Sequence, residues 1–127
     1  MLVLLQGVVD GGTGSRLRFK YNITAQMGGK TGTTNRNSDA WFMGVTPDLV
    51  SGVWVGGEDR DIHFDSMAMG QGATMALPIY AYFMKKVYRN NSLPYKPNAI
   101  FDLPENFDGC TQTSEQDDMM DIEDVFE

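Results

Sequence analysis

Two short apolar runs that lie close together constrain the fold of this chain more than any other feature. Residues Trp41 to Val45 and Val53 to Val55 carry no charged side chains. Thr46-Pro47-Asp48 lies between the runs, and proline in such a segment presets a tight turn. The pattern predicts two antiparallel strands, roughly 39–46 and 49–57. Continuous apolar strands are typical of sheets covered on both faces, so we expect Trp41 and Trp54 to lie in the core.

The flanking segments predict a third strand and a helix. The strand covers about 27–33, and the helix runs from about Ala73 to Arg89 after a loop at 58–72. The apolar residues of the helix recur at spacings of three and four, as expected for one buried face: Ala76, Ile79, Tyr80, Phe83, Met84 and Val87. The predicted class is α+β, an antiparallel sheet with packed helices. This helix can cover only one face of the sheet, so the chain reads as part of a larger domain.

The N-terminal quarter of the chain predicts a helix followed by an extended segment. Residues 1–9 are apolar but too short to cross a bilayer, and we interpret them as the end of a helix that stops at Gly11-Gly12. They lack the basic leader of a signal peptide. Residues 16–26 alternate between polar and apolar side chains, which favours an exposed extended segment.

Charge separates the chain into a body and a tail. The net charge is −7, yet residues 1–109 contain ten acidic and ten basic side chains, and the remaining seven acids lie between Glu115 and Glu127. A near-neutral body without a basic stripe argues against nucleic-acid binding. We expect one domain segment at 1–93 and, at 94–127, a proline-containing and then acidic tail that is disordered. Cys110 stands alone and His63 is the only histidine, so no disulfide, metal site or cofactor is expected.

The segment with chemical character is Lys30-Thr31-Gly32-Thr33-Thr34-Asn35, which follows Gly28-Gly29. Its position before a strand suggests a lysine presented along a sheet edge, with a glycine beside it. A phosphate-binding loop is the rival interpretation, because glycine, lysine and threonine end that pattern as well. The pattern requires glycine where Thr24 stands, and a helix after the lysine where a strand is predicted. Nucleotide binding is therefore disfavoured.

The motif belongs to a series of segments in a specific order and spacing. The series comprises Gly12-Thr13-Gly14, residues 29–35, Asp39 to Pro47, Val53 to Gly56, Ala76 to Ile79 and Phe83-Met84. It resembles the C-terminal part of the transpeptidase domain of class A, bifunctional penicillin-binding proteins, over about residues 1–90. The resemblance implies a partial serine β-lactamase/transpeptidase-like fold without a cofactor or metal.

The resemblance also implies roles for the motif residues. Lys30 would place positive charge near the serine of the Ser-x-Asn motif and help to attract the substrate carboxylate. Thr33 would offer its hydroxyl to that carboxylate and its N–H to the oxyanion hole, and Thr31 and Gly32 would complete the substrate-binding edge. The substrate would be the D-Ala-D-Ala end of a peptidoglycan stem peptide, or a β-lactam. Asp39 is interpreted as a turn carboxylate at a strand start, with support of the loop around Asn35 as the alternative.

The chain departs from the family pattern in one important respect. It contains neither Ser-x-x-Lys nor Ser-x-Asn, so the nucleophile is missing and no acyl-enzyme can form. We expect an inactive fragment of a parent that works on the periplasmic or extracytoplasmic side of the inner membrane. The parent would be anchored there through an N-terminal part that this chain lacks, and it would also carry a glycosyltransferase domain. A noncatalytic peptidoglycan-binding or interaction module remains the alternative.

Overall fold

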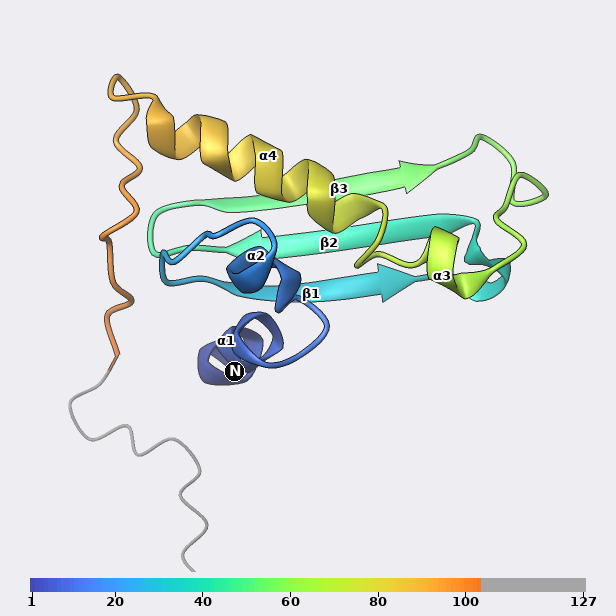
Figure 1. Ribbon diagram of the computed structural model, residues 1–127, viewed down its shortest axis with the longest axis horizontal. Helices are drawn as coiled ribbons and strands as arrows, with labels where there is room; N and C mark the ends of the chain where they lie inside the picture. Colours follow the sequence, from blue (N-terminus) through green and yellow to red (C-terminus); the bar gives the residue numbers. More distant parts are fainter. Residues whose placement is uncertain (104–127) are drawn as a thin grey trace, which may run out of the picture.

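A three-stranded antiparallel sheet forms the centre of the molecule in the computed structural model, which describes residues 1–103 (Figure 1). The strands are β1 (Gly28–Thr33), β2 (Asp39–Val45) and β3 (Val50–Gly56), in the order β1-β2-β3. The register pairs Thr33 with Ala40, and Trp41 with both Gly32 and Trp54. The predicted α+β class and the three predicted strands, including the β2–β3 hairpin, are confirmed.

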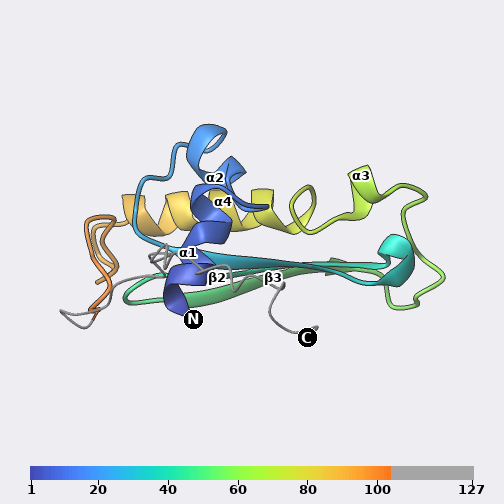
Figure 2. The same ribbon diagram turned by 90° about the horizontal axis from the view of Figure 1, so that it is seen from below.

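The helices gather mainly on one side of this sheet. They are α1 (Leu2–Asp10), α2 (Arg16–Phe19), the 3₁₀ turn η1 (Asn35–Asn37), α3 (Met67–Gly70) and α4 (Ala76–Arg89). The edge-on view shows α2, α3 and α4 on the same side of the sheet (Figure 2). Helix α1 packs beside β1, and α4 packs across β2 and β3. The predicted N-terminal helix is present and ends at Asp10, directly before the predicted stop at Gly11-Gly12. In the described part of the chain, no helix has the length and apolar character needed to cross a membrane.

The core lies between α4 and the helix-side face of the sheet. Tyr80 of α4 is fully buried, and its ring lies 4.8 Å from the ring of Phe42. Its phenol contacts the backbone of β2 at Gly44, where an added Cβ would collide with the Tyr80 ring. Burial raises the pKa of the Tyr80 phenol well above its usual range. Close approach of α4 to the sheet therefore depends on a glycine at position 44.

The opposite face of the sheet is open to solvent over the described residues, and this corrects the prediction for the two tryptophans. Trp41 is 44% exposed and Trp54 is 48% exposed, so neither is a core residue here. Successive strand residues point to opposite faces, and both tryptophans fall on the face away from α4. Their rings instead pack against each other, with centroids 6.4 Å apart.

The segment at residues 16–26 also differs from the prediction of an exposed extended strand. Its first residues form the short helix α2. Phe19 is exposed, but the other apolar members of the alternation are buried: Leu17, Tyr21 and Ile23. The nearby Ala25 is buried as well. The Arg18 guanidinium explains the fold of this segment, because it donates to the Ile23 and Ala25 carbonyl oxygens at 2.8 and 2.7 Å. It also forms an ion pair with Asp10 at 2.7 Å. The alternation of polar and apolar residues therefore reflects burial against the core and not an extended strand.

Helix α4 begins later than predicted and buries a slightly rotated face. It starts at Ala76 instead of Ala73, and the preceding loop contains α3. Ile79 and Phe83 are about half exposed, at 51% and 44%, while Leu77 and Ala81 are fully buried. The apolar residues of α4 cover two adjacent faces of the helix. The spacing of these residues does not indicate which of the two faces packs against the sheet.

The beginning of the predicted tail runs without helix or strand along the described residues. Within 94–103, the Phe101 N–H donates to the Gln26 side-chain oxygen at 2.9 Å. The acidic segment and Cys110 lie outside the described residues.

Candidate functional site

Strand β1 carries the predicted motif on an edge of the sheet. Strand β1 pairs only with β2, so its other side is a free edge of the sheet. The Thr34 N–H donates to the Asp39 carbonyl of β2 at 3.1 Å. Backbone groups alternate in direction along an antiparallel strand, so the N–H and C=O groups of Thr33 and Thr31 point away from β2. The motif therefore presents the backbone N–H and C=O groups of two residues, Thr31 and Thr33, along the free edge of the sheet.

The Lys30 ammonium lies on this same edge. Its side chain is exposed, and Nζ donates to the carbonyl oxygen of Thr31 at 2.7 Å. That carbonyl belongs to the outward-pointing set, so the cation bends from its strand position toward the open side of β1. A positive charge and outward N–H donors are thus grouped along one short stretch of backbone.

The other three predicted residues are held by contacts on the two faces of the sheet. The Thr31 hydroxyl lies 3.1 Å from the Thr13 hydroxyl, which belongs to the loop after α1. The Thr33 hydroxyl accepts a hydrogen bond from the Gly72 N–H at 3.2 Å. Gly32 faces the opposite way, and a Cβ there would stand 3.2 Å from the Trp41 Cβ. Lys30, Thr31, Gly32 and Thr33 are therefore brought together along one strand.

Asp39 stabilises the turn that follows the motif. Its carboxylate accepts from the Trp54 indole N–H at 2.9 Å and from the Thr34 and Ser38 hydroxyls, each at 3.0 Å. These donors, the Trp54 indole foremost, lower the pKa of the Asp39 carboxyl. The turn itself is tight, because Arg36 and Asn37 have φ angles of 62° and 56°. Asp39 thus combines both sequence interpretations: it starts a strand and it supports the loop around Asn35.

A polar hollow lies at the end of β1, next to the motif. Its volume is about 330 Å³, and it is lined by Thr33, Thr34, Asn35, Ser38 and Arg60. Arg60 comes from the loop after β3 and adds a second cation near the C-terminal end of the motif. Sequence reasoning missed Arg60 and Gly72 and gave Thr13 no role in the site, since only the fold brings these residues beside β1.

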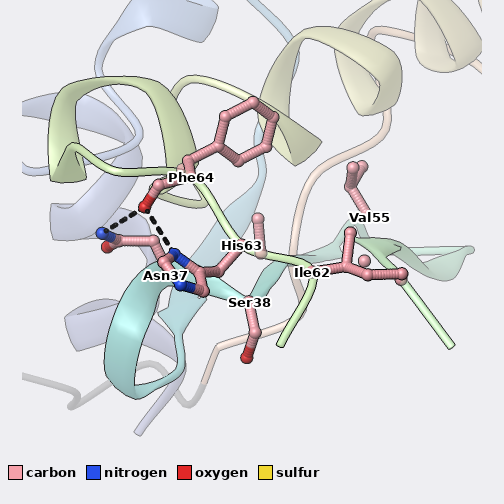
Figure 3. Close-up of a pocket in the computed structure, with 10 residues that line it drawn as sticks. Asn37, Ser38, Val55, Ile62, His63 and Phe64 are labelled. Carbon is pink, nitrogen blue, oxygen red and sulfur yellow. Dashed lines mark hydrogen bonds between the residues drawn. The ribbon is translucent and has the colours of Figure 1, made fainter. Parts of the chain in front are cut away.

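A second, more apolar cavity of about 300 Å³ lies beneath the loop that follows β3 (Figure 3). Val55 and Ile62 line it, and the Asn37 side-chain amide donates to the Phe64 carbonyl at 3.3 Å. His63 Nδ1 lies 3.4 Å from the same oxygen, so His63 is engaged in shaping the loop. This cavity contains none of the residues from Lys30 to Thr33, and we do not assign the motif's chemistry to it.

The edge is suited to bind an extended peptide that ends in an anion. Outward N–H groups can pair with peptide carbonyls or stabilise an oxyanion, and the lysine can attract a carboxylate. Within residues 1–103, no cluster of three or more histidine, cysteine or acidic side chains could hold a metal ion.

Comparison with known proteins gives a consistent set of relatives. The chain is 40% identical over 98 residues to penicillin-binding protein 1A of Rickettsia typhi, a match to 76% of this chain and 12% of that protein. It is 41% identical over 101 residues to penicillin-binding protein 1A of Aquifex aeolicus, which covers 80% of this chain and 12% of the relative. Penicillin-binding protein 1B of Vibrio cholerae is 40% identical over 96 residues, 75% of this chain and 11% of its own length.

A solved structure agrees with these relatives. The crystal structure of penicillin-binding protein 1A from Haemophilus influenzae matches with a TM-score of 0.63 and 30% identity, covering 80% of this chain and 15% of that one. No family model matches the chain. The chain spans about an eighth of the length of the curated relatives that it matches.

Proposed function

Because this chain belongs to the penicillin-binding protein 1A and 1B family, we propose that it forms the substrate-binding edge of a peptidoglycan D,D-transpeptidase. The complete enzyme cross-links stem peptides by serine acyl transfer and also carries a glycosyltransferase. The observation that carries this proposal is the edge position of β1, with Lys30 and the outward Thr33 N–H on its open side. The substrate is the D-Ala-D-Ala end of a stem peptide, and β-lactams bind in its place.

Each residue of the edge has a defined task in this proposal. The peptide lies antiparallel to β1 and pairs with the outward backbone groups. The Thr33 N–H donates to the carbonyl oxygen that becomes negative during acyl transfer, a contribution of about 10²–10³ in rate for such a donor. Lys30 favours the negative charge that develops nearby and attracts the terminal carboxylate, and the Thr33 hydroxyl donates to that carboxylate.

The nucleophile comes from a part of the enzyme that these 127 residues do not contain, because they hold no Ser-x-x-Lys or Ser-x-Asn motif. We propose that this other part covers the face of the sheet that carries Trp41 and Trp54. The enzyme works on the periplasmic or extracytoplasmic side of the inner membrane, and an N-terminal part of the enzyme anchors it there. By itself the chain binds substrate without forming an acyl-enzyme.

Labelling with a fluorescent penicillin tests this proposal. A longer protein translated from the same reading frame, including upstream Ser-x-x-Lys and Ser-x-Asn motifs, should be labelled covalently, and the 127-residue chain should not. In the longer protein, Lys30→Ala should slow labelling by at least about 10²-fold, the scale expected for loss of one electrostatic catalytic group. Lys96→Ala, an exposed lysine far along the chain, is the matched control and should label normally.

Two outcomes would contradict the proposal. Covalent labelling of the 127-residue chain would show that the nucleophile lies within it. Equal labelling rates for Lys30→Ala and Lys96→Ala would remove Lys30 from the catalytic edge.

A further inference from the structure

We infer that Gly72 is a positioning residue that fixes the Thr33 hydroxyl as a hydrogen-bond donor for the substrate carboxylate. This inference rests on the proposed function, since it concerns how the same edge recognises an anion. The inference starts from the hydrogen bond that the Gly72 N–H donates to Thr33 Oγ1 at 3.2 Å. The two residues are 39 positions apart in the sequence.

The direction of this hydrogen bond determines what the hydroxyl can still do. A threonine hydroxyl has one hydrogen to donate and an oxygen that can accept. Gly72 can only donate through its backbone N–H, so Thr33 Oγ1 is the acceptor and its own hydrogen stays free. The hydroxyl is therefore prepared to donate to an incoming acceptor. A carboxylate is the strongest acceptor of this kind, because hydrogen bonds to ionised groups are shorter and stronger than neutral ones.

The segment around Gly72 is anchored firmly enough to impose this direction. The Gly72 carbonyl accepts from the N–H groups of Ala76 and Leu77, at 3.1 and 2.9 Å, so it is part of the first turn leading into α4. Arg16 of α2 donates to the Ala73 carbonyl at 3.1 Å. Helix α4 is in turn locked on the sheet through buried Tyr80. The position of the Gly72 N–H is thus set by the core.

Space at this position admits only glycine. An added Cβ on Gly72 would collide with the Trp41 carbonyl oxygen and would stand 2.8 Å from the Gly32 carbonyl oxygen. Both are backbone atoms of the β1–β2 ladder, which cannot rotate away as a flexible side chain can. The φ angle of Gly72 is not positive, so the requirement is close approach to the motif strand and not an unusual backbone conformation.

The experiment measures the preference of the 127-residue chain for a C-terminal carboxylate. We would titrate ¹⁵N-labelled chain with diacetyl-Lys-D-Ala-D-Ala and, separately, with its C-terminal amide, following backbone amide signals of β1. The wild-type chain should prefer the carboxylate by about tenfold, as expected for one hydrogen bond to a charged group. Thr33→Val should reduce the preference to the part that the Lys30 charge supplies, and Thr33→Ser should keep it in full.

Gly72 is then tested through the same ratio. Gly72→Ala should reduce the preference in the wild-type background but not further in the Thr33→Val background, because both changes act through the same hydrogen bond from the Thr33 hydroxyl to the carboxylate. Gly11→Ala, at a glycine with open space around its Cβ position, is the matched control and should leave the ratio unchanged. If Gly72 had a purely structural role, Gly72→Ala would weaken the binding of both peptides equally. The ratio of the two affinities would then stay the same, and this result would overturn the inference.

A second measurement covers the case in which Gly72→Ala does not fold. In Thr33→Val the Gly72 amide should exchange its hydrogen faster than in the wild type, and Thr33→Ser should restore slow exchange. An unchanged Gly72 exchange rate would overturn the inference while leaving the proposed function intact. A different outcome would overturn peptide binding by β1 itself. The wild-type chain would bind neither peptide, while its Gly72 amide would still exchange slowly and would exchange faster in Thr33→Val.

Discussion

At the scale of single residues, the motif is supported by the Asp39 carboxylate, which the sequence indicates as a strand-start turn residue, with support of the loop around Asn35 as the alternative. Asp39 joins the turn after β1 to the indole of Trp54 on β3. It therefore links the end of the proposed substrate edge to the far strand of the sheet. Sequence position could identify Asp39 as a turn residue. It could not reveal the Trp54 contact, because that contact depends on the register of the hairpin.

The ionisation of Asp39 should make the stability of the chain depend on acid. Hydrogen bonds lower its pKa in the folded state, so its contribution is present above the ordinary carboxyl pKa and is lost as pH falls through the folded-state value. Urea unfolding between about pH 5 and pH 2 should show stability decreasing more steeply in the wild type than in Asp39→Asn. Asp65→Asn, an exposed carboxylate in the loop before α3, is the control and should follow the wild type. Identical slopes for Asp39→Asn and wild type would contradict this role.

At the scale of elements, the hairpin was predictable and the helix contacts were not. The turn at Pro47 and the apolar runs specify β2 and β3 through local chemistry. By contrast, residues 16–26 show the alternation of a strand, yet they coil into α2 and a buried segment because Arg18 satisfies their carbonyls. A side chain that bonds five and seven residues ahead leaves no periodic signal. The buried face of α4 is likewise not visible in the sequence spacing, because it depends on how the helix packs against the sheet.

The packing of α4 on the sheet should depend on Gly44 more than on any helix propensity. Gly44→Ala forces a methyl group into the ring of Tyr80, and overpacking of this kind destabilises by about 1–3 kcal/mol. Gly7→Ala in α1 adds the same methyl group where no atom lies within 4 Å. It should raise helix stability, by up to about 1 kcal/mol. Chemical unfolding of the two variants measures the difference, and equal stabilities would refute the close α4–sheet contact.

At the scale of the whole molecule, one layer of the predicted architecture is open. The apolar strands predicted a sheet covered on both faces, and α4 covers one of them. The residues of the open face are Trp41, Met43, Val50 and Trp54, and each is at least 41% exposed. The sequence pattern reflects the complete domain, while burial in the described residues reflects this chain alone. The mispredicted tryptophans are therefore informative, since they mark the surface that we propose is covered by another part of the enzyme.

This open face should make the isolated chain self-associate. Contiguous exposed apolar surface of this kind is typical of interaction sites and of aggregation. Sedimentation velocity should show species larger than a monomer that increase with concentration, and a hydrophobic dye should bind. Trp41→Lys places a charge at the centre of the face beside Trp54, and it should shift the chain toward monomer and reduce dye binding.

Phe19→Lys is the matched control for that substitution. Phe19 is an aromatic residue of α2 with 75% of its surface exposed, on the helix side of the sheet. The change removes the same kind of side chain and adds the same charge, but leaves the open face intact, so self-association should persist. Circular dichroism should show that both variants stay folded. A wild-type chain that remains monomeric at every concentration and binds no hydrophobic dye would contradict the prediction that the open face drives self-association.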